Sequence, residues 1–130
     1  MRRLTVALAV IAALALVPAA LAAGGLSGKY KTVIKGDTAL GGALNGTWTI
    51  KFTRGHYAVA DNGKVVIHGV NTYTGNTITF TDKSGPDACK GTGKYTFKVT
   101  GTKVKFTKVS DTAACAGRQA VLNHTFTKVG

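Results

Sequence analysis

The regular alternation of apolar and polar residues is the feature that most constrains the fold of this chain. From Gly28 onward, short runs place an aromatic or branched residue at every second position, and Gly, Asn and Asp separate the runs. A period of two is typical of half-buried strands, and short polar links are typical of antiparallel hairpins. The pattern predicts eight strands, over residues 29–35, 47–53, 56–60, 65–74, 77–81, 94–100, 103–109 and 124–129.

Eight strands with hairpin-length links favour an all-β fold that closes on itself. A closed barrel has no free sheet edges, and eight strands leave an interior that side chains fill or that holds one small ligand. A two-sheet sandwich is the alternative, although sandwiches usually need longer connections. We therefore expect an eight-stranded antiparallel up-and-down barrel, with one short helical segment within residues 111–122 before the last strand.

The first 22 residues have the pattern of a secretory signal peptide. Arg2 and Arg3 precede an apolar run over residues 4–17, and small residues at Ala20 and Ala22 form a cleavage site. The expected organisation is a signal peptide over 1–22 and one barrel domain over 23–130. The apolar run is shorter than the span of about 20 residues that a membrane requires, so no stable membrane insertion is expected. The prediction is a secreted bacterial protein, extracellular or associated with the cell envelope.

The chain is strongly basic. It contains 17 Lys and Arg against five acidic residues, all Asp, and its net charge is +12. Such a charge favours anionic neighbours, and an anionic cell-envelope polymer is a candidate partner. The lysines occur singly along the strands rather than in clusters, which argues against a nucleic-acid partner. We expect a monomer.

The two cysteines predict a single disulfide. An exported protein folds in an oxidising compartment, where Cys89 and Cys115 most simply pair. They lie 12 residues before and 14 residues after the expected hairpin turn at Gly101, so both reach the same end of that hairpin. The bond should fasten the helical segment to the start of an earlier strand, with Ala120, Val121 and Leu122 lying over one barrel end.

Arg118 is unusual because the chain otherwise supplies positive charge with lysine. An arginine beside the expected disulfide indicates a need for a planar guanidinium, either stacked on an aromatic ring or engaged in a forked hydrogen bond. A solvated surface arginine is the alternative.

Several short motifs resemble those of the lipocalin-like (calycin) barrels, in particular the small exported bacterial forms. They are "GKY" at 28–30, "GTW" at 46–48 after a glycine-rich loop, and the order Asp111, Cys115, Arg118. The resemblance covers nearly all of the chain after the leader.

The resemblance implies a structural closure and a binding function. Tyr30, Trp48 and Arg118 would close one end of the barrel, with Arg118 packed across Tyr30, where lipocalins carry a Trp. It also implies that the barrel mouth binds a small apolar ligand.

The interior pattern allows two interpretations. Nine aromatic side chains share the inward parity and could fill the barrel completely: Trp48, Phe52, Tyr57, Tyr73, Phe80, Tyr95, Phe97, Phe106 and Phe126. In the return strand, Val65, Ile67, Gly69 and Asn71 are also expected to point inward, unless a bulge at Gly69 changes the parity.

Polar residues of inward parity favour a pocket, since ligand sites combine apolar walls with a few polar groups. We predict ligand contacts at Tyr57, Asn71, Tyr73 and His124, near the Gly41–Gly42 loop and the hairpin tips. The alternative is a packed barrel that acts through its surface, as an inhibitor of an exported enzyme or as a basic cell-envelope module.

The sequence gives no indication of catalysis, a cofactor or a metal. Ser27, Ser84 and Ser110 lie in turns, Glu is absent, and no inward-facing acid is expected on any strand. The three histidines lack metal-ligand spacing. We therefore expect a protein that is not an enzyme and that uses no cofactor.

Overall fold

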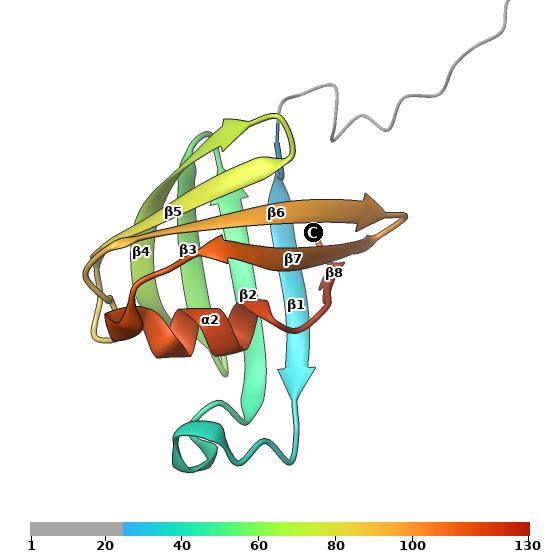
Figure 1. Ribbon diagram of the computed structural model, residues 1–130. Helices are drawn as coiled ribbons and strands as arrows, with labels where there is room; N and C mark the ends of the chain where they lie inside the picture. Colours follow the sequence, from blue (N-terminus) through green and yellow to red (C-terminus); the bar gives the residue numbers. More distant parts are fainter. Residues whose placement is uncertain (1–24) are drawn as a thin grey trace, which may run out of the picture.

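The computed structural model describes residues 25–130, and the signal peptide predicted over residues 1–22 lies outside the described residues. Within residues 25–130 the chain forms a closed antiparallel barrel in which each strand pairs with the next (Figure 1). The strands are β1 (Gly28–Ile34), β2 (Gly46–Thr53), β3 (His56–Asp61), β4 (Lys64–Thr74), β5 (Thr77–Ser84), β6 (Thr92–Thr100), β7 (Lys103–Ser110) and β8 (Phe126–Lys128). The predicted up-and-down barrel is confirmed.

The last strand closes the barrel with few residues. β8 pairs with β1 through Tyr30–Lys128 and with β7 through Val104–Phe126. It is shorter than the run 124–129 that the sequence pattern indicates, but Val129 still donates a backbone hydrogen bond to Lys29. The chain end therefore lies against the first strand.

The β3–β4 hairpin turns at Asn62–Gly63. Both residues have positive φ angles, 49° and 84°, which is the conformation that favours an Asn-Gly turn. The register then shifts, because Val59 pairs with Ile67 whereas Ala60 pairs with Val65. This irregularity buries Val66 and leaves Val65 46% exposed, so the prediction that Val65 points inward is wrong.

The helical segment before the last strand is also confirmed. It consists of the 3-10 turn η2 (Ala113–Cys115) and the helix α2 (Ala116–Leu122), which lies across the barrel wall (Figure 1). The helix buries Val121 and Leu122. A second 3-10 turn, η1 (Ala39–Gly42), occupies the glycine-rich loop that the pattern predicts to be irregular. In the described part of the chain, no helix has the length and hydropathy needed to cross a membrane.

Aromatic rings fill most of the interior. Phe80 lies at the centre, with ring centroids 5.2 to 6.3 Å from those of Tyr57, Tyr95, Phe106 and Phe52. Of the nine aromatic residues with inward parity, Tyr73 is half-buried and the others are buried.

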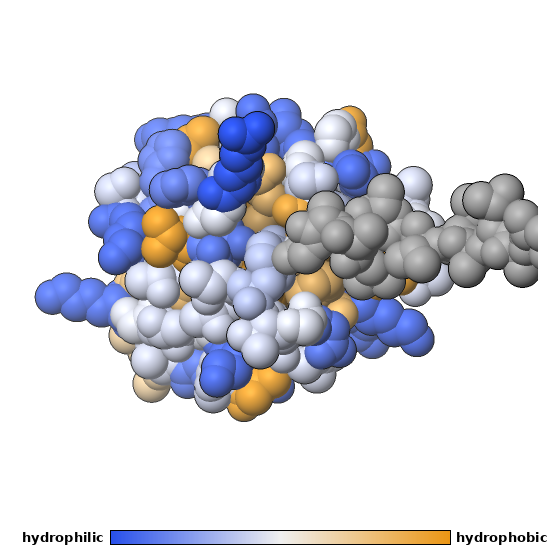
Figure 2. All heavy atoms as spheres, turned by 90° about the horizontal axis from the view of Figure 1, so that it is seen from above, coloured by the Kyte–Doolittle hydropathy of each residue, from blue (hydrophilic) through white to orange (hydrophobic). Residues whose placement is uncertain are grey.

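From the end that carries the β2–β3 and β4–β5 hairpins, the molecule shows a mixed, mainly hydrophilic surface (Figure 2).

A candidate ligand-binding cavity

A cavity of about 270 Å³ remains at the barrel end next to η1 and α2. Its walls come from four parts of the chain: the loop around η1, the inner faces of β2 to β5, the β5–β6 connection, which supplies Asp87, and α2. The apolar lining comprises Leu40, Ala43, Leu44, Trp48, Ile50, Val59, Ile67, Phe80, Val121 and Leu122. The interior aromatics therefore do not fill the barrel completely.

Trp48 connects the cavity wall to the loop that covers it. Its indole Nε1 donates a hydrogen bond of 2.7 Å to the carbonyl oxygen of Leu44, and both residues are buried. Leu40, in the same loop, has a left-handed backbone (φ 52°) and is 56% exposed at the cavity rim. The loop around η1 therefore forms one rim of the cavity.

A buried arginine borders the cavity at α2. The Nε and Nη2 atoms of Arg118 donate to the two carboxylate oxygens of Asp111, at 2.9 and 2.7 Å, and Nη2 also donates to the carbonyl oxygen of Gly91. The Arg118 side chain is 6% exposed and that of Asp111 is fully buried. This pair of bonds is the forked hydrogen bond that the sequence predicts as one of the possible roles of Arg118.

A second carboxylate lies on the other side of the guanidinium. The side chain of Asp82 is 1% exposed, and its Oδ1 lies 3.5 Å from Nη1 of Arg118. It accepts hydrogen bonds from the Tyr57 hydroxyl and, at 3.0 Å, from the backbone N–H of Cys89. Asp82 thus joins β5, the cavity wall and the loop that carries the disulfide.

Arg118 and Asp111 shift each other's pKa. Burial alone would raise the pKa of Asp111, but the bonds from Arg118, Tyr95 and the Thr112 N–H hold it below its usual value. Burial would lower the pKa of Arg118, but the bonds to Asp111 raise it. The pKa values of Tyr57 and Tyr95 are raised, chiefly by burial and then by their carboxylate partners. Arg118 and Asp111 are therefore charged, and the hydroxyl groups of Tyr57 and Tyr95 are neutral.

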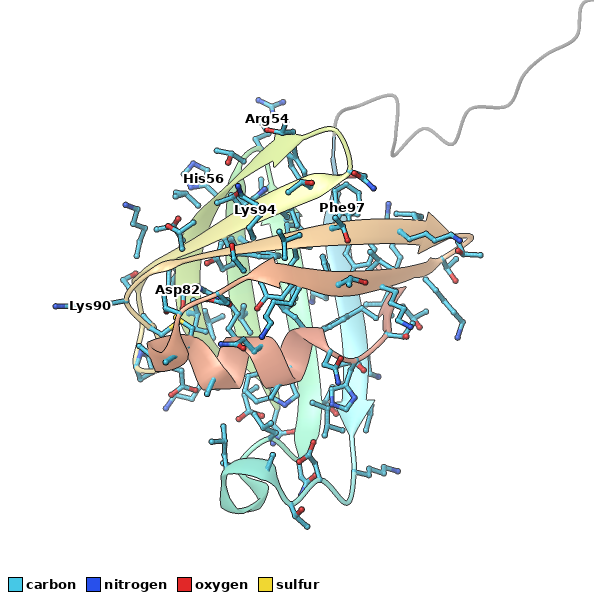
Figure 3. All side chains as sticks on the ribbon, in the orientation of Figure 1. Arg54, His56, Asp82, Lys90, Lys94 and Phe97 are labelled. Atoms are coloured by element: carbon cyan, nitrogen blue, oxygen red, sulfur yellow. A yellow bond between two sulfur atoms is a disulfide. The ribbon has the colours of Figure 1, made fainter. Side chains whose placement is uncertain are left out.

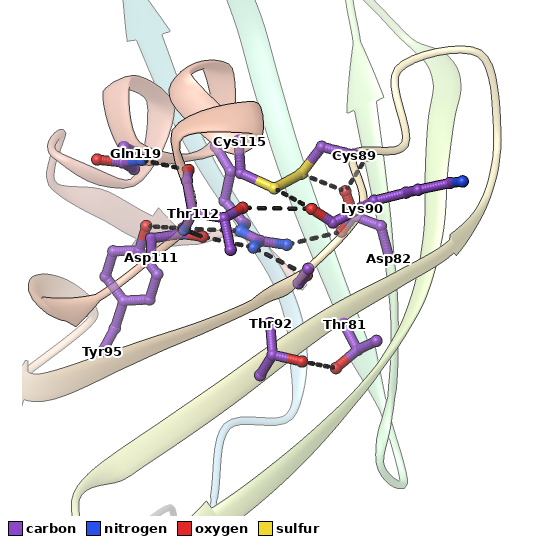
Figure 4. Close-up of a disulfide and its surroundings, with 12 residues drawn as sticks. Thr81, Asp82, Cys89, Lys90, Thr92, Tyr95, Asp111, Thr112, Cys115 and Gln119 are labelled. Carbon is purple, nitrogen blue, oxygen red and sulfur yellow. Dashed lines mark hydrogen bonds and ion pairs between the residues drawn. A yellow bond between two sulfur atoms is a disulfide. The ribbon is translucent and has the colours of Figure 1, made fainter.

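The predicted disulfide is present beside this network (Figure 4). Cys89 and Cys115 are bonded, with their Cα atoms 5.4 Å apart. Cys89 lies in the β5–β6 connection and Cys115 ends η2, so the bond holds the start of α2 next to the two carboxylates.

The four predicted ligand contacts do not share one pocket. Tyr57 lines the cavity, whereas the other three are not among its lining residues. Asn71 is 5% exposed within the barrel, and the Tyr73 hydroxyl accepts a hydrogen bond of 3.0 Å from the Leu26 N–H. His124 lies with its Nε2 atom 3.9 Å from Asp37.

The closure that the resemblance implied has different partners. Tyr30 packs edge-to-face on Phe52, with ring centroids 5.8 Å apart, while Arg118 is engaged by Asp111 and Asp82. The pairing of Arg118 with Tyr30 is therefore corrected. The physical reason is that the disulfide holds α2 beside the carboxylates, whereas Tyr30 belongs to the β1–β8 seam.

The acidic side chains of the cavity were not predicted from the sequence. Asp61, Asp82 and Asp87 all contribute to its lining, although no inward-facing acid was expected. The alternation of residues could have identified two of them. Asp61 has the same inward parity as Tyr57 and Val59, and Asp82 has the same parity as Ile78 and Phe80. Within residues 25–130, no group of three or more His, Cys, Asp or Glu side chains is arranged to hold a metal ion.

Comparison with protein-family models, with curated proteins and with solved structures finds no match to this chain. The class that the coordinates define is a closed eight-stranded antiparallel barrel with a cavity at one end. This architecture is consistent with a lipocalin-like fold.

Proposed function

We propose that this protein binds a small, mostly apolar molecule in the cavity beside Trp48, and that it acts as a secreted binding protein rather than an enzyme. The observation that carries the proposal is an apolar cavity left open in an otherwise aromatic-packed barrel. Ligand pockets commonly measure about 300 to 1,000 Å³. A volume of about 270 Å³ therefore favours a ligand near the small end of that range. The disulfide is compatible with secretion.

A matched pair of surface substitutions tests the proposal. Leu40 and Val33 are both exposed apolar residues, but only Leu40 lines the cavity. With the neutral fluorescent probe N-phenyl-1-naphthylamine, Leu40→Ala should weaken binding several-fold, because it removes apolar wall area at the rim. Val33→Ala should leave the probe affinity unchanged. Equal affinities for the wild type and both variants would contradict the proposal.

One observation also favours a second function, binding of an anionic cell-envelope polymer by the outer surface. Five consecutive strands, β6, β7, β8, β1 and β2, contain no acidic residue, and nine of the 13 lysines lie on them. They are Lys29, Lys31, Lys51, Lys94, Lys98, Lys103, Lys105, Lys108 and Lys128, all exposed. We call this surface the lysine face.

The strand register places like charges directly opposite each other on the lysine face. Lys29 pairs with Lys51, and Lys98 pairs with Lys105. Directly opposed like charges destabilise a sheet. A bound polyanion would relieve that repulsion, and it would do so less effectively at high salt.

Heparin, used as a polyanion probe, tests the lysine face. The triple variant Lys29→Gln, Lys98→Gln, Lys105→Gln should elute from a heparin column at clearly lower salt than the wild type. The control triple variant, Lys64→Gln, Lys83→Gln, Lys90→Gln, loses the same charge from other exposed sites, of which Lys90 extends away from the barrel in Figure 3. If the two variants elute at the same salt concentration, binding depends on net charge alone, and the proposal that the lysine face binds the polyanion is overturned.

A further inference from the structure

Two buried polar atoms without a hydrogen-bond partner belong to residues that line the cavity. Among the described residues, three buried side-chain atoms make no hydrogen bond: Oδ1 of Asp61, Oδ1 of Asn71 and Nη1 of Arg118. Asp61 and Arg118 both line the cavity. Nη1 of Arg118 lies 3.5 Å from the Asp82 carboxylate, so Oδ1 of Asp61 is the one of these two atoms that has no polar partner. Since an unsatisfied buried acceptor costs about 1 to 3 kcal/mol, this oxygen favours a guest that donates a hydrogen bond.

The cavity is acidic within a basic protein. Three of the five Asp residues of the chain, Asp61, Asp82 and Asp87, line it, whereas Arg118 is the only basic residue of the lining. Arg118 is already paired with Asp82 and Asp111. The lining therefore has a surplus of negative charge, and a cationic guest is favoured over an anionic one.

Asp61 is the carboxylate of the lining whose charge is least compensated. Asp82 receives the bonds from Tyr57 and Cys89, and Asp87 is exposed to solvent. The ion pairs of the described residues involve Asp82, Asp111 and Asp37, but not Asp61. Its partly buried carboxylate thus remains available to a ligand.

The strand register sets Asp61 beside an aromatic ring. Trp48 and Asp61 are direct cross-strand partners in the β2–β3 ladder, and both line the cavity. A carboxylate next to an indole is a favourable environment for a protonated amine, which gains a charge-assisted hydrogen bond from the first and a cation–π contact from the second.

We propose that the ligand of the cavity is a small amphipathic amine, with its ammonium group bound by Asp61 against Trp48 and its apolar body directed towards Ile50, Phe80 and Leu122. This inference rests on the proposed binding function. It adds the chemical class of the ligand and names Asp61 as the residue that selects it.

Three compounds of the same size and shape test the inference on the wild-type protein. 2-Phenylethylamine, 2-phenylethanol and phenylacetate carry similar apolar bodies with a cationic, a neutral and an anionic group. In displacement of N-phenyl-1-naphthylamine, the amine should bind about tenfold more tightly than the alcohol, which corresponds to one charge-assisted hydrogen bond, and phenylacetate should bind most weakly.

The variant Asp61→Asn then identifies the residue responsible. It keeps the shape and one acceptor oxygen, so it should lower the affinity for the amine about tenfold and the affinity for the alcohol much less, which removes most of the preference for the amine. Asp87→Asn removes the same charge at an exposed lining position and should leave most of the preference intact. Thermal unfolding of each variant verifies that it is folded.

The outcomes separate the two proposals. If the probe binds but the amine shows no preference over the alcohol, or if Asp61→Asn leaves that preference unchanged, the amine inference is overturned and the binding function stands. If neither the probe nor any of the three compounds binds saturably, the binding function itself fails.

Discussion

At the scale of single residues, Arg118 is the centre of a buried ion-pair network. Its guanidinium bridges two buried carboxylates that belong to different strands, Asp82 on β5 and Asp111 directly after β7. Removing one partner of such a buried ion pair typically costs about 3 to 5 kcal/mol, because the remaining charge stays buried. The geometry of the cavity wall near α2 therefore depends on this residue.

The absence of a side chain at Gly93 leaves room for the Arg118–Asp111 ion pair. A Cβ atom at Gly93 would lie 2.6 Å from Oδ2 of Asp111 and 2.9 Å from Nε of Arg118, whereas a Cβ at Gly117 would meet no atom within 4 Å. We expect Gly93→Ala to lower the free energy of unfolding by about 1 to 3 kcal/mol, as overpacking does. Gly117→Ala, within α2, should raise it by about 0.5 to 1 kcal/mol.

Urea unfolding of both glycine variants measures these changes. A Gly93→Ala protein as stable as the wild type would show that the Arg118–Asp111 pair is free to shift. The Gly117 variant controls for the general effect of replacing glycine with alanine.

At the scale of elements, the disulfide determines where α2 lies. The helix has only seven residues, which is too short for independent stability, and the bond at Cys115 anchors its start. We expect reduction of the Cys89–Cys115 bond to lower the free energy of unfolding by about 3 to 4 kcal/mol, given a separation of 26 residues. Probe affinity should fall as well, because α2 supplies Val121 and Leu122 to the cavity.

Unfolding and probe titration in the presence and absence of dithiothreitol test this prediction. If the reduced protein keeps the probe affinity of the oxidised one, α2 is held by packing alone and the disulfide is not what shapes the cavity.

The alternation of residues predicted the elements well and the site only in part. A period of two fixes which side chains face inward, so the strands and the interior aromatics followed from it. The disulfide followed instead from the presence of two cysteines at similar distances from one hairpin turn. It does not fix position along the barrel axis. Tyr57 and Tyr73 share an inward parity, yet only Tyr57 lines the cavity. Asp61 and Asp82 have the inward parity of their strands. They were not predicted to line the interior because each follows the end of an alternating run and reads as the start of a loop.

At the scale of the whole molecule, the buried network predicts how stability depends on pH. The pKa of Asp111 is lowered on folding, so its contribution is present above the ordinary value of about 4 and is lost as the pH falls below it. The pKa values of Tyr57 and Tyr95 are raised, so their contributions are present below about pH 10 and are lost above it. We expect stability to decline below pH 4 and above pH 10.

Urea midpoints measured from pH 2 to pH 11 give this profile. Tyr95→Phe removes one of the two tyrosine hydroxyls that donate to buried carboxylates, and it should make the decline above pH 10 shallower. An alkaline decline that is identical in this variant and in the wild type would assign it to other groups.

The protein carries its charges in two separate regions. The lysine face covers five strands on the outside, and acidic side chains line the cavity that η1 and α2 border. The cavity also contains the only tryptophan of the chain, so occupancy has an internal reporter.

The most direct test is energy transfer from Trp48 to N-phenyl-1-naphthylamine in the wild-type protein. We predict that Trp48 emission falls as probe emission rises, with saturation at one probe per chain. Binding that leaves Trp48 emission unchanged, or that does not saturate, would contradict a ligand site inside the barrel.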